Sequence, residues 1–404
     1  MKILMINSVC GIKSTGRICV DIARKLEKMG NEVKIAYGRE YVPEQYEKYA
    51  VRIGTEKDVK IHGIKARLFD ASGLGSAKST KKFLEWVEEY DPDIIHLHNI
   101  HGYYINIKIL FDYIKKSNKK IIWTLHDCWT FTGHCAYFDM VSCDKWKVGC
   151  NKCVQKSQYP TSLLFDFSRK NYNLKKNIFC NIENLVIVTP SEWLKKLVKQ
   201  SILKEYRVNT IYNGVNTAVF RYRKESDIVK VKYGIQNKKV ILGVAAVWDQ
   251  RKGLNEFIKL SRLIDKDKYS IILVGLSKKQ INELPDSVIG IERTDSIDEL
   301  AMVYSAAEVY FNPTFEDNYP TTNLEAISCG TPVITYDTGG SVESAKQYGA
   351  VVEKGNVERV YEIIENKEYA KLSPVVDNTV FINQYIKLYE SVYYEKKENI
   401  SGEL

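Results

Sequence analysis

Residues 312–334 read NPTFEDNYPTTNLEAISCGTPVI, and this stretch decides the fold prediction. It follows a predicted strand at 308–312, passes through a polar loop into a helical pattern, and ends in a predicted strand at 332–336. Apolar strands that alternate with helices are typical of a parallel sheet with both faces covered. The stretch therefore predicts a strand–loop–helix–strand unit of a doubly wound α/β domain.

The same alternation extends along the chain in both directions. Helical patterns such as 17–29 and 81–90 separate short apolar runs. The strands predicted in the first half are 2–7, 32–37, 94–98, 120–125 and 185–189. Those predicted in the second half are 239–247, 269–275, 288–292, 308–312, 332–336 and 350–353.

An Asn-Gly turn signal at Asn213-Gly214 separates the two sets of strands. We therefore expect two doubly wound domains rather than one long sheet, as the length of 404 residues also suggests. The predicted limits are 1–205 for the first domain, 206–380 for the second, and 381–404 for a C-terminal helix and tail that packs back toward the first domain.

The stretch at 312–334 resembles the signature of the retaining glycosyltransferases of family 4, which have the GT-B fold. That signature runs from a proline through two acids to a Gly-x-Pro-Val strand, and the matching residues here are Pro313, Thr314, Glu325, Ala326, Gly330, Pro332 and Val333. The resemblance covers nearly the whole chain and is weaker before residue 90. The text around Cys128–Cys135 looks like a capsule or colanic-acid-type branch.

The resemblance implies two Rossmann-like domains that face each other across a central cleft. It also implies transfer of a sugar from a UDP- or GDP-sugar to a saccharide acceptor, with retention at the anomeric carbon, in surface polysaccharide synthesis. The first domain would serve the acceptor and the second would bind the donor.

The loop that enters the helix at 321 supplies the predicted acids of the donor site. Glu325 matches the family acid that holds the ribose hydroxyls. The other acid should lie eight places earlier, where this chain has Asp317, whereas a loop bulged by one residue would bring Glu316 there. We favour Asp317 because the alignment then has no gap, and we expect Asn318 and Tyr319 to contact the donor.

The loop after the predicted strand 239–247 departs from the family pattern Arg-x4-Lys-Gly. Lys252 matches the lysine, but Val247 stands where the arginine belongs, so Arg251 is the candidate to supply the missing charge. A cation at this point stabilises the leaving diphosphate as its charge develops. The predicted chemistry therefore needs no metal or other cofactor.

Several small residues are further candidates for donor binding. Gly339 and Gly340 match a Gly-Gly-x-x-Glu turn of the family, although a purely structural turn is an alternative. Gly275 and Thr294 are candidates on the base side. Gly16 belongs to the first loop, which the family uses near the acceptor and the donor phosphate.

His126 is the candidate of the acceptor side. It follows the predicted strand 120–125, where the family has a histidine that faces the donor sugar. A neutral imidazole can hydrogen-bond a hydroxyl or a phosphate at pH 7. A histidine with a purely structural role is the alternative, and His98 or Asn99 could touch the acceptor.

Four of the nine cysteines form a cluster with the spacing Cys-x7-Cys-x6-Cys-x2-Cys, at Cys135, Cys143, Cys150 and Cys153. A Cys-x2-Cys turn is a common half of a zinc site because both thiolates reach one ion. We expect a structural zinc that staples this loop. Reduced structural thiols and disulfides are the alternatives.

The net charge is +9, but the sequence contains no recognition-helix or RNA-stacking motif, so a nucleic-acid partner is not expected. No run of about 18 apolar residues exists and the N-terminal apolar run is short, which predicts a cytoplasmic protein. The basic pattern at 192–199 could lie on the inner membrane face that holds a lipid-linked acceptor, or it could be a core helix with a solvated basic face.

Two rival functions fit the same architecture. A sugar-nucleotide 2-epimerase-like isomerase would need no acceptor surface. A non-catalytic nucleotide-sugar-binding protein is suggested by the missing arginine and the shifted acid.

Overall fold

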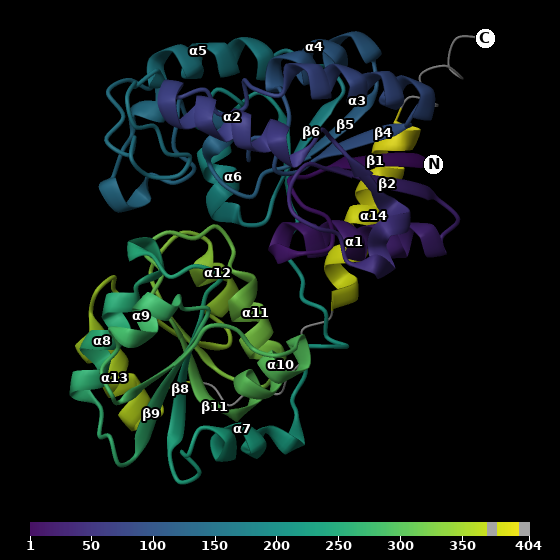
Figure 1. Ribbon diagram of the computed structural model, residues 1–404. Helices are drawn as coiled ribbons and strands as arrows, with labels where there is room; N and C mark the ends of the chain where they lie inside the picture. The colour runs from purple at the N-terminus through teal and green to yellow at the C-terminus, as the bar shows by residue number, and fades with distance from the viewer. Residues whose placement is uncertain (370–377, 396–404) are drawn as a thin grey trace. The chain divides into compact units, whose positions relative to one another are not determined.

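The computed structural model describes residues 1–369 and 378–395 (Figure 1). The chain divides into two compact units. The first comprises residues 1–212 together with the chain from Phe381 onward, and the second comprises 213–380. Each unit is a parallel sheet with helices packed against it.

The sheet of the first unit has seven strands, and every strand pairs in parallel with its neighbours. The strand order reverses between β1 and β4: successive strands are added outward from β1 on one side and from β4 on the other. In spatial order the strands are β3 (Ala50–Arg52), β2 (Glu32–Tyr37), β1 (Lys2–Ile6), β4 (Ile94–Leu97), β5 (Lys120–Thr124), β6 (Leu185–Thr189) and β7 (Arg207–Thr210).

Alternate residues of these strands belong to two separate cores. Ile3 and Met5 of β1 lie in one apolar cluster, whereas Leu4 and Ile6 lie in the other. A strand with helices on both faces must be apolar at every position, which explains the unbroken runs in the sequence. The helices of this unit are α1 (Lys13–Lys28), α2 (Glu56–Phe69), α3 (Ala77–Tyr90), α4 (Ile107–Ser117), α5 (Ser168–Phe179), α6 (Glu192–Val198) and α14 (Asn378–Tyr394).

The sheet of the second unit has six strands, again all parallel. Its order reverses between β8 and β11: β10 (Val288–Ile291), β9 (Tyr269–Val274), β8 (Lys239–Val244), β11 (Ala307–Asn312), β12 (Val333–Tyr336) and β13 (Gly349–Val352). The helices are α7 (Asp227–Lys232), α8 (Leu254–Leu263), α9 (Lys278–Asn282), α10 (Ile297–Ala306), α11 (Thr321–Ser328), α12 (Ser341–Ala345) and α13 (Val357–Asn366).

All eleven strands expected from the sequence are present, and the structure adds two at opposite edges of the first sheet. β3 has only three residues, too few for a pattern. β7 reads Arg-Val-Asn-Thr, with one apolar side chain, yet it pairs with β6 over four residues. Because β7 completes the first sheet, the first unit extends to Tyr212, beyond the predicted limit of 205.

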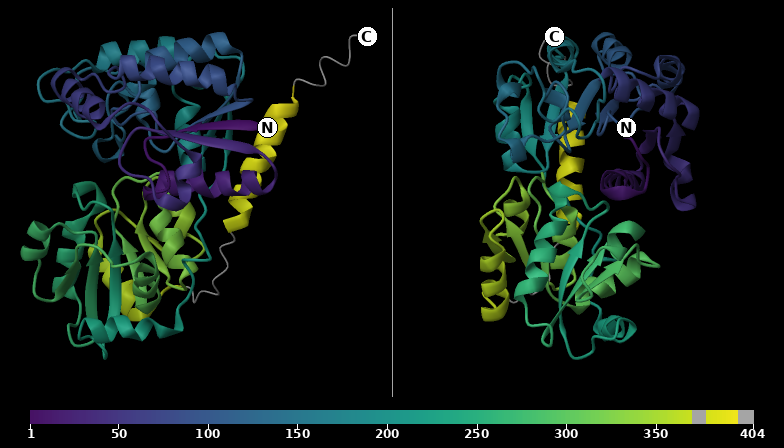
Figure 2. Two further views of the ribbon diagram at one scale, coloured as in Figure 1. Left: turned by 45° about the vertical axis from the view of Figure 1, so that its right-hand side comes forward. Right: turned by 60° about the vertical axis from the view of Figure 1, so that its left-hand side comes forward.

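Helix α14 returns to the first unit, where it lies beside the strands in both views of Figure 2. Its buried side chains Phe381, Tyr385, Tyr389 and Val392 complete one of the two cores. The C-terminal helix expected within 381–404 ends at Tyr394, and residues 396–404 of the expected tail lie outside the described part of the chain. None of the described helices is long and apolar enough to cross a membrane.

Candidate active site

The candidate donor site lies where the strand order of the second sheet reverses. The loops that follow β8 and β11 leave neighbouring strands at this point and turn to opposite sides, which is where open α/β sheets bind ligands. The first loop carries Lys252 and the second carries Asp317, so residues 65 positions apart in sequence meet at one edge.

The loop after β8 is shaped by a cap and a glycine. The side chain of Asp249 accepts a hydrogen bond of 2.9 Å from the Lys252 N–H, which caps the short turn Gln250–Lys252. Gly253 then adopts a φ of +73°, and a Cβ there would lie 2.3 Å from the Pro313 carbonyl oxygen. Only glycine allows the two loops to approach so closely.

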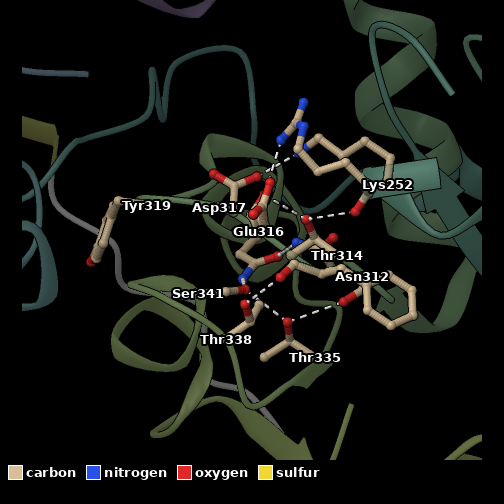
Figure 3. A network of polar contacts seen from close by, with 12 residues as sticks. Lys252, Asn312, Thr314, Glu316, Asp317, Tyr319, Thr335, Thr338 and Ser341 are labelled. Atoms are coloured by element: carbon tan, nitrogen blue, oxygen red, sulfur yellow. Dashed lines mark hydrogen bonds and ion pairs between the residues drawn. The ribbon is translucent and has the colours of Figure 1, made fainter. Parts of the chain in front are cut away.

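Two cations of the loop after β8 contact the loop at 313–320 after β11, which we call the acidic loop. The Nζ of Lys252 forms an ion pair with the Asp317 carboxylate, and Arg251 Nη1 donates to the Glu316 carbonyl oxygen at 2.9 Å (Figure 3). The Phe315 N–H donates in turn to the Arg251 carbonyl oxygen at 2.8 Å. Asp317 and Glu316 are both buried. Of the two acids, it is Asp317 that contacts the lysine, and its role toward a donor stays a prediction.

A buried network of polar side chains connects the two ends of the acidic loop to the loop after β12. Asn323 of α11 accepts from the Asn312 amide at 2.7 Å and donates to Ser344 at 2.8 Å and to Ser341 at 3.2 Å. Thr335 at the end of β12 completes it through Ser341 at 2.7 Å (Figure 3). A network with every member bonded fixes the loop ends without a ligand.

The glycine turn after β12 packs directly on the acidic loop. Gly340 donates its N–H to the Asp317 carbonyl oxygen at 3.2 Å. A Cβ on Gly339 would lie only 2.0 Å from that same oxygen. Gly339 is therefore required here for close backbone contact, and Gly340 contributes its N–H. Contact of either glycine with a donor stays a prediction.

Glu325 lies in α11, behind the acidic loop. It is buried and its carboxylate accepts a hydrogen bond of 3.0 Å from the Tyr304 hydroxyl. Burial, and then the charge of Glu325, raises the pKa of this tyrosine well above its usual range, so the hydroxyl keeps its proton. A fixed O–H donor orients the carboxylate for a second hydrogen bond.

The structure thus brings together most of the predicted donor residues. Gly275 joins them across the sheet, because a Cβ there would lie 1.7 Å from the carbonyl oxygen of Ala245 after β8. Asn318 is buried in the acidic loop, and Tyr319 points away from the polar network (Figure 3). Thr294 follows β10, three strands away from β11, and Gly16 belongs to α1 of the first unit.

Some supporting residues were missed in the sequence. Asn323, Ser341 and Tyr304 are separated along the chain and share no motif, so their contact could not be expected. Asp249 could have been found, because an Asp three positions before Lys252 is a capping pattern.

At the acceptor side, two histidines end neighbouring strands of the first sheet. His126 after β5 lies 3.0 Å from His98 after β4, measured between His126 Nε2 and His98 Nδ1. Burial lowers the pKa of His126 to about 4 and that of His98 well below its usual range, so both rings are neutral at pH 7. The buried Nε2 of His98 has no hydrogen-bond partner among the described residues.

Neighbouring groups hold this edge in place. Asn7 after β1 accepts a hydrogen bond of 3.3 Å from the Asn99 N–H, which joins the loops where the first sheet reverses its strand order. His101 lies 2.8 Å from the Asp127 carboxylate. His96 is structural, since it contacts the Tyr389 hydroxyl of α14 at 2.5 Å and Thr124 at 2.8 Å.

The four clustered cysteines are thiols, and none of them forms a disulfide. Cys135 and Cys153 share a thiol–thiol hydrogen bond, which lowers the pKa of Cys153 to about 7. Burial raises the pKa of Cys150 to about 11. In residues 1–369 and 378–395, no group of three or more His, Cys, Asp or Glu side chains is arranged to hold a metal ion, so the zinc remains a prediction.

Each half of the chain matches a sequence profile of glycosyltransferases. The sequence profile described as Glycosyltransferase Family 4 matches residues 15–219, just over half of the chain. A second profile, described as Glycosyl transferases group 1, matches residues 238–366.

One relative is the putative colanic acid biosynthesis glycosyl transferase WcaC of Escherichia coli strain K12. It is 26% identical over 271 residues, which cover 64% of this chain and 63% of the relative. The chain matches less than two thirds of the length of this and the next curated relatives.

Solved structures show the same fold over nearly the whole chain. Sucrose-phosphate synthase of Thermosynechococcus elongatus has a TM-score of 0.71 at 16% identity, with 98% of this chain and 100% of that chain covered. HepE of Anabaena in complex with UDP-glucose has a TM-score of 0.66 at 14% identity, with 97% and 100% covered. The expected GT-B architecture of two Rossmann-like units is thereby confirmed.

Proposed function

This chain belongs to Glycosyltransferase Family 4, and from that premise we propose that it transfers a sugar from a nucleotide-diphosphate sugar to a saccharide acceptor in polysaccharide synthesis. The observation that carries the proposal is the Lys252–Asp317 pair, a cation and a carboxylate held together at the switch point of the second sheet. Leaving diphosphates need such a cation, and sugar hydroxyls are well held by such a carboxylate.

We assign the donor to the second unit. A diphosphate offers Lys252 a second anionic partner, which would release Asp317 to accept hydrogen bonds from the hydroxyls of the sugar. Lys252 then stabilises the charge that develops on the diphosphate as the glycosidic bond breaks. Glu325, oriented by Tyr304, takes the ribose hydroxyls. The UDP-glucose complex of HepE supports UDP as the first nucleotide to test.

We assign the acceptor to the first unit, where His126 and His98 form a neutral pair. A neutral imidazole can accept a proton or donate one in a hydrogen bond to a hydroxyl without placing a charge beside the donor phosphate. The acceptor hydroxyl attacks the anomeric carbon from the side that the diphosphate leaves, which retains the configuration. The bond to the acceptor oxygen forms as the bond to the diphosphate breaks, and the hydroxyl proton passes to the departing diphosphate oxygen. The family signature at 312–334 supports retention, and we further propose that the acceptor is carried on a lipid.

The test is incubation of the purified protein with UDP- and GDP-sugars and a saccharide acceptor, followed by mass spectrometry and NMR of the products. Transfer with the same anomeric configuration as the donor is the expected outcome. An epimerised donor would indicate a 2-epimerase-like isomerase. Binding of nucleotide sugars without turnover would indicate a binding protein, and Lys252→Ala is the variant that must lose the transfer.

A further inference from the structure

Helix α2 packs in an unusual orientation. The residues that it buries are His62, Gly63 and Ala66. Its larger apolar side chains point to solvent instead, with Ile64 55% exposed and Ile61 44% exposed. A helix on a globular surface normally buries such residues, so the outward isoleucines of α2 need another explanation.

A second exposed apolar run lies against the C-terminal end of this helix. Residues 163–167 read Leu-Leu-Phe-Asp-Phe, and all five are exposed. Leu163 and Leu164 are 61% and 62% exposed. Single exposed apolar residues are ordinary on protein surfaces, whereas a contiguous patch marks an interaction site.

Backbone hydrogen bonds hold this run in its exposed position. The Leu163 N–H donates to the Arg67 carbonyl oxygen at 2.7 Å, and the Phe167 N–H donates to the buried carboxylate of Asp70 at 2.8 Å. The Phe165 ring stacks on Phe69 at 5.9 Å and on Phe167 at 5.4 Å between ring centroids. The helix and the run therefore form one surface, the docking surface, made of Ile61, Ile64, Phe69, Leu163, Leu164, Phe165 and Phe167.

Basic residues flank the docking surface in sequence, and its acids are engaged: Asp70 is buried, and the exposed Asp166 accepts backbone hydrogen bonds. The segments 60–70 and 163–170 contain two acids. Asp70 accepts from His134 at 2.5 Å, and Asp166 accepts from the Ser168 N–H at 2.9 Å and the Cys153 N–H at 2.6 Å. The same segments present the exposed cations Lys60, Lys65, Arg67, Arg169 and Lys170.

We propose that the docking surface binds an anionic lipid bilayer, with its apolar side chains in the interface and its cations at the headgroups. Exposed Leu, Ile and Phe combined with Lys and Arg are the chemistry of interfacial membrane binding. Charge favours a bilayer over a second copy of this chain, because two copies would bring ten cations together. For helix α6 the sequence left a membrane-surface helix and a core helix as alternatives, and the burial of Leu194 and Val198 favours the core helix.

The docking surface also connects to the acceptor side of the first unit. The Tyr103 ring lies 3.6 Å from a Cβ built on Gly63 of α2, and its centroid is 6.4 Å from that of Tyr159. The Tyr159 hydroxyl contacts His101 at 3.1 Å. A bilayer bound at the docking surface would therefore present a lipid-linked saccharide near the loops after β4 and β5. This consequence rests on the proposed function, whereas the bilayer binding does not.

The experiment is cosedimentation with vesicles of phosphatidylglycerol and phosphatidylethanolamine, compared with vesicles of phosphatidylcholine. The full chain should bind the anionic vesicles, and the binding should weaken with salt. The variant Leu163→Ser/Leu164→Ser/Phe165→Ser should lose at least about tenfold in partition coefficient, because three side chains no longer enter the interface. Lys65→Glu/Lys170→Glu, which leaves the apolar residues intact, should lose about fivefold or more.

The control is Ile228→Ser/Val231→Ser on α7, which removes two apolar residues of similar exposure and should leave binding unchanged. Equal binding of the wild type to both vesicle types, or unchanged binding of both surface variants, would overturn the proposal. So would a concentration-dependent dimer, seen by light scattering, that the Ser variant abolishes. Transfer to a short water-soluble acceptor should persist in all these variants, so a protein that binds vesicles but transfers nothing would refute only the proposed function.

Discussion

The carboxyl edges of the two sheets differ in the kind of polar group that they carry. The second sheet ends in paired charges, with Lys252 against Asp317 and Arg251 against the backbone of the acidic loop. At the first sheet the neutral rings of His126 and His98 contact each other, and His101 lies against the Asp127 carboxylate. All six histidines of the sequence lie in the first unit.

The difference matches the ligand that we propose for each edge. A diphosphate carries formal charge and leaves with more of it, so a cation that is already in place lowers the barrier. A sugar hydroxyl is neutral, and a neutral hydrogen-bonding group suits it. The comparison teaches that two similar sheets can serve two different ligands through the residues that follow their strands.

Removal of the Lys252 charge should have the largest effect. Lys252→Ala is expected to lower kcat by about 2–4 kcal/mol of transition-state stabilisation, because the leaving diphosphate loses its preorganised cation. Initial rates at saturating donor measure this. Arg251→Ala is the matched variant, with a smaller loss expected because its guanidinium is engaged by the Glu316 carbonyl oxygen. Wild-type turnover in Lys252→Ala would show that the Lys252 charge does not stabilise the leaving diphosphate.

The two neighbouring acids give the next test. Asp317→Asn should reduce kcat/KM by about 1.5–3 kcal/mol, the range of a hydrogen bond to a charged group. Glu316→Gln should cost less, since the carboxylate of Asp317 is paired with Lys252. The reverse order of initial rates would mean that Glu316 fills the acidic position when the donor binds.

Glu325 should act on binding more than on turnover. Glu325→Gln is expected to weaken nucleotide affinity by about 1.5–3 kcal/mol, because one charged hydrogen-bond acceptor of the ribose is lost. Calorimetry with the free nucleotide measures the change. Tyr304→Phe, which removes only the orienting hydroxyl, should show a smaller loss in the same direction, and an unchanged affinity in both variants would contradict the ribose assignment.

Acid should destabilise the first unit selectively. Burial lowers the pKa of His62 and of His126 to about 4 and that of His96 to about 3, below the usual 6.5. Between pH 6.5 and 4 the unfolded chain binds these protons and the folded chain does not, so stability falls as pH falls through this window. Each histidine should cost about 1 kcal/mol between pH 7.5 and 5.5.

Two groups oppose this loss and should not cancel it. Burial raises the pKa of Asp21 to about 6, and Asp70, against the opposing effect of burial, raises the pKa of His134. Hydrogen exchange at pH 7.5 and 5.5 measures both units in one sample. Equal loss of protection in the second unit, which has no histidine, would contradict the prediction.

The smallest expected effect concerns the thiol loop. Purified protein without a His-tag should contain about one zinc per chain, lost in Cys150→Ser, because four thiolates in a Lys-rich loop favour this ion. Chelation should lower Tm by a few degrees and leave transfer activity in place. Metal-free wild-type protein with all four thiols titratable would leave the hydrogen-bonded thiols of Cys135 and Cys153 as the resting state.

Much of the fold could be predicted because its strands are rich in consecutive apolar residues. Residues 3–6 and 271–274 are apolar at every position and are buried, as in strands of a sheet covered on both faces. β7 could not be predicted, because Val208 is its one apolar residue and its order comes from pairing with β6. The domain limit was placed too early for the same reason.

The candidate donor site was predictable where its residues share a local motif. Lys252 and Asp317 each follow a strand, and strand ends of a parallel sheet meet at one edge. The sequence favoured Asp317 over Glu316 for the family's acidic position but did not predict its ion pair with Lys252, because side-chain direction in a loop depends on hydrogen bonds from elsewhere. Here Gly340 and Arg251 fix the backbone of that loop.

By itself the sequence determined the strand and helix periodicity, the family signature at 312–334 and the residues that follow each strand. These are local properties, set by residue type and spacing along the chain. Only the tertiary structure decided which core of the first unit the side chains of α14 complete and that α2 turns its isoleucines outward. It also paired His98 with His126. These outcomes depend on packing between segments far apart in sequence, where burial and hydrogen bonding outweigh any local preference.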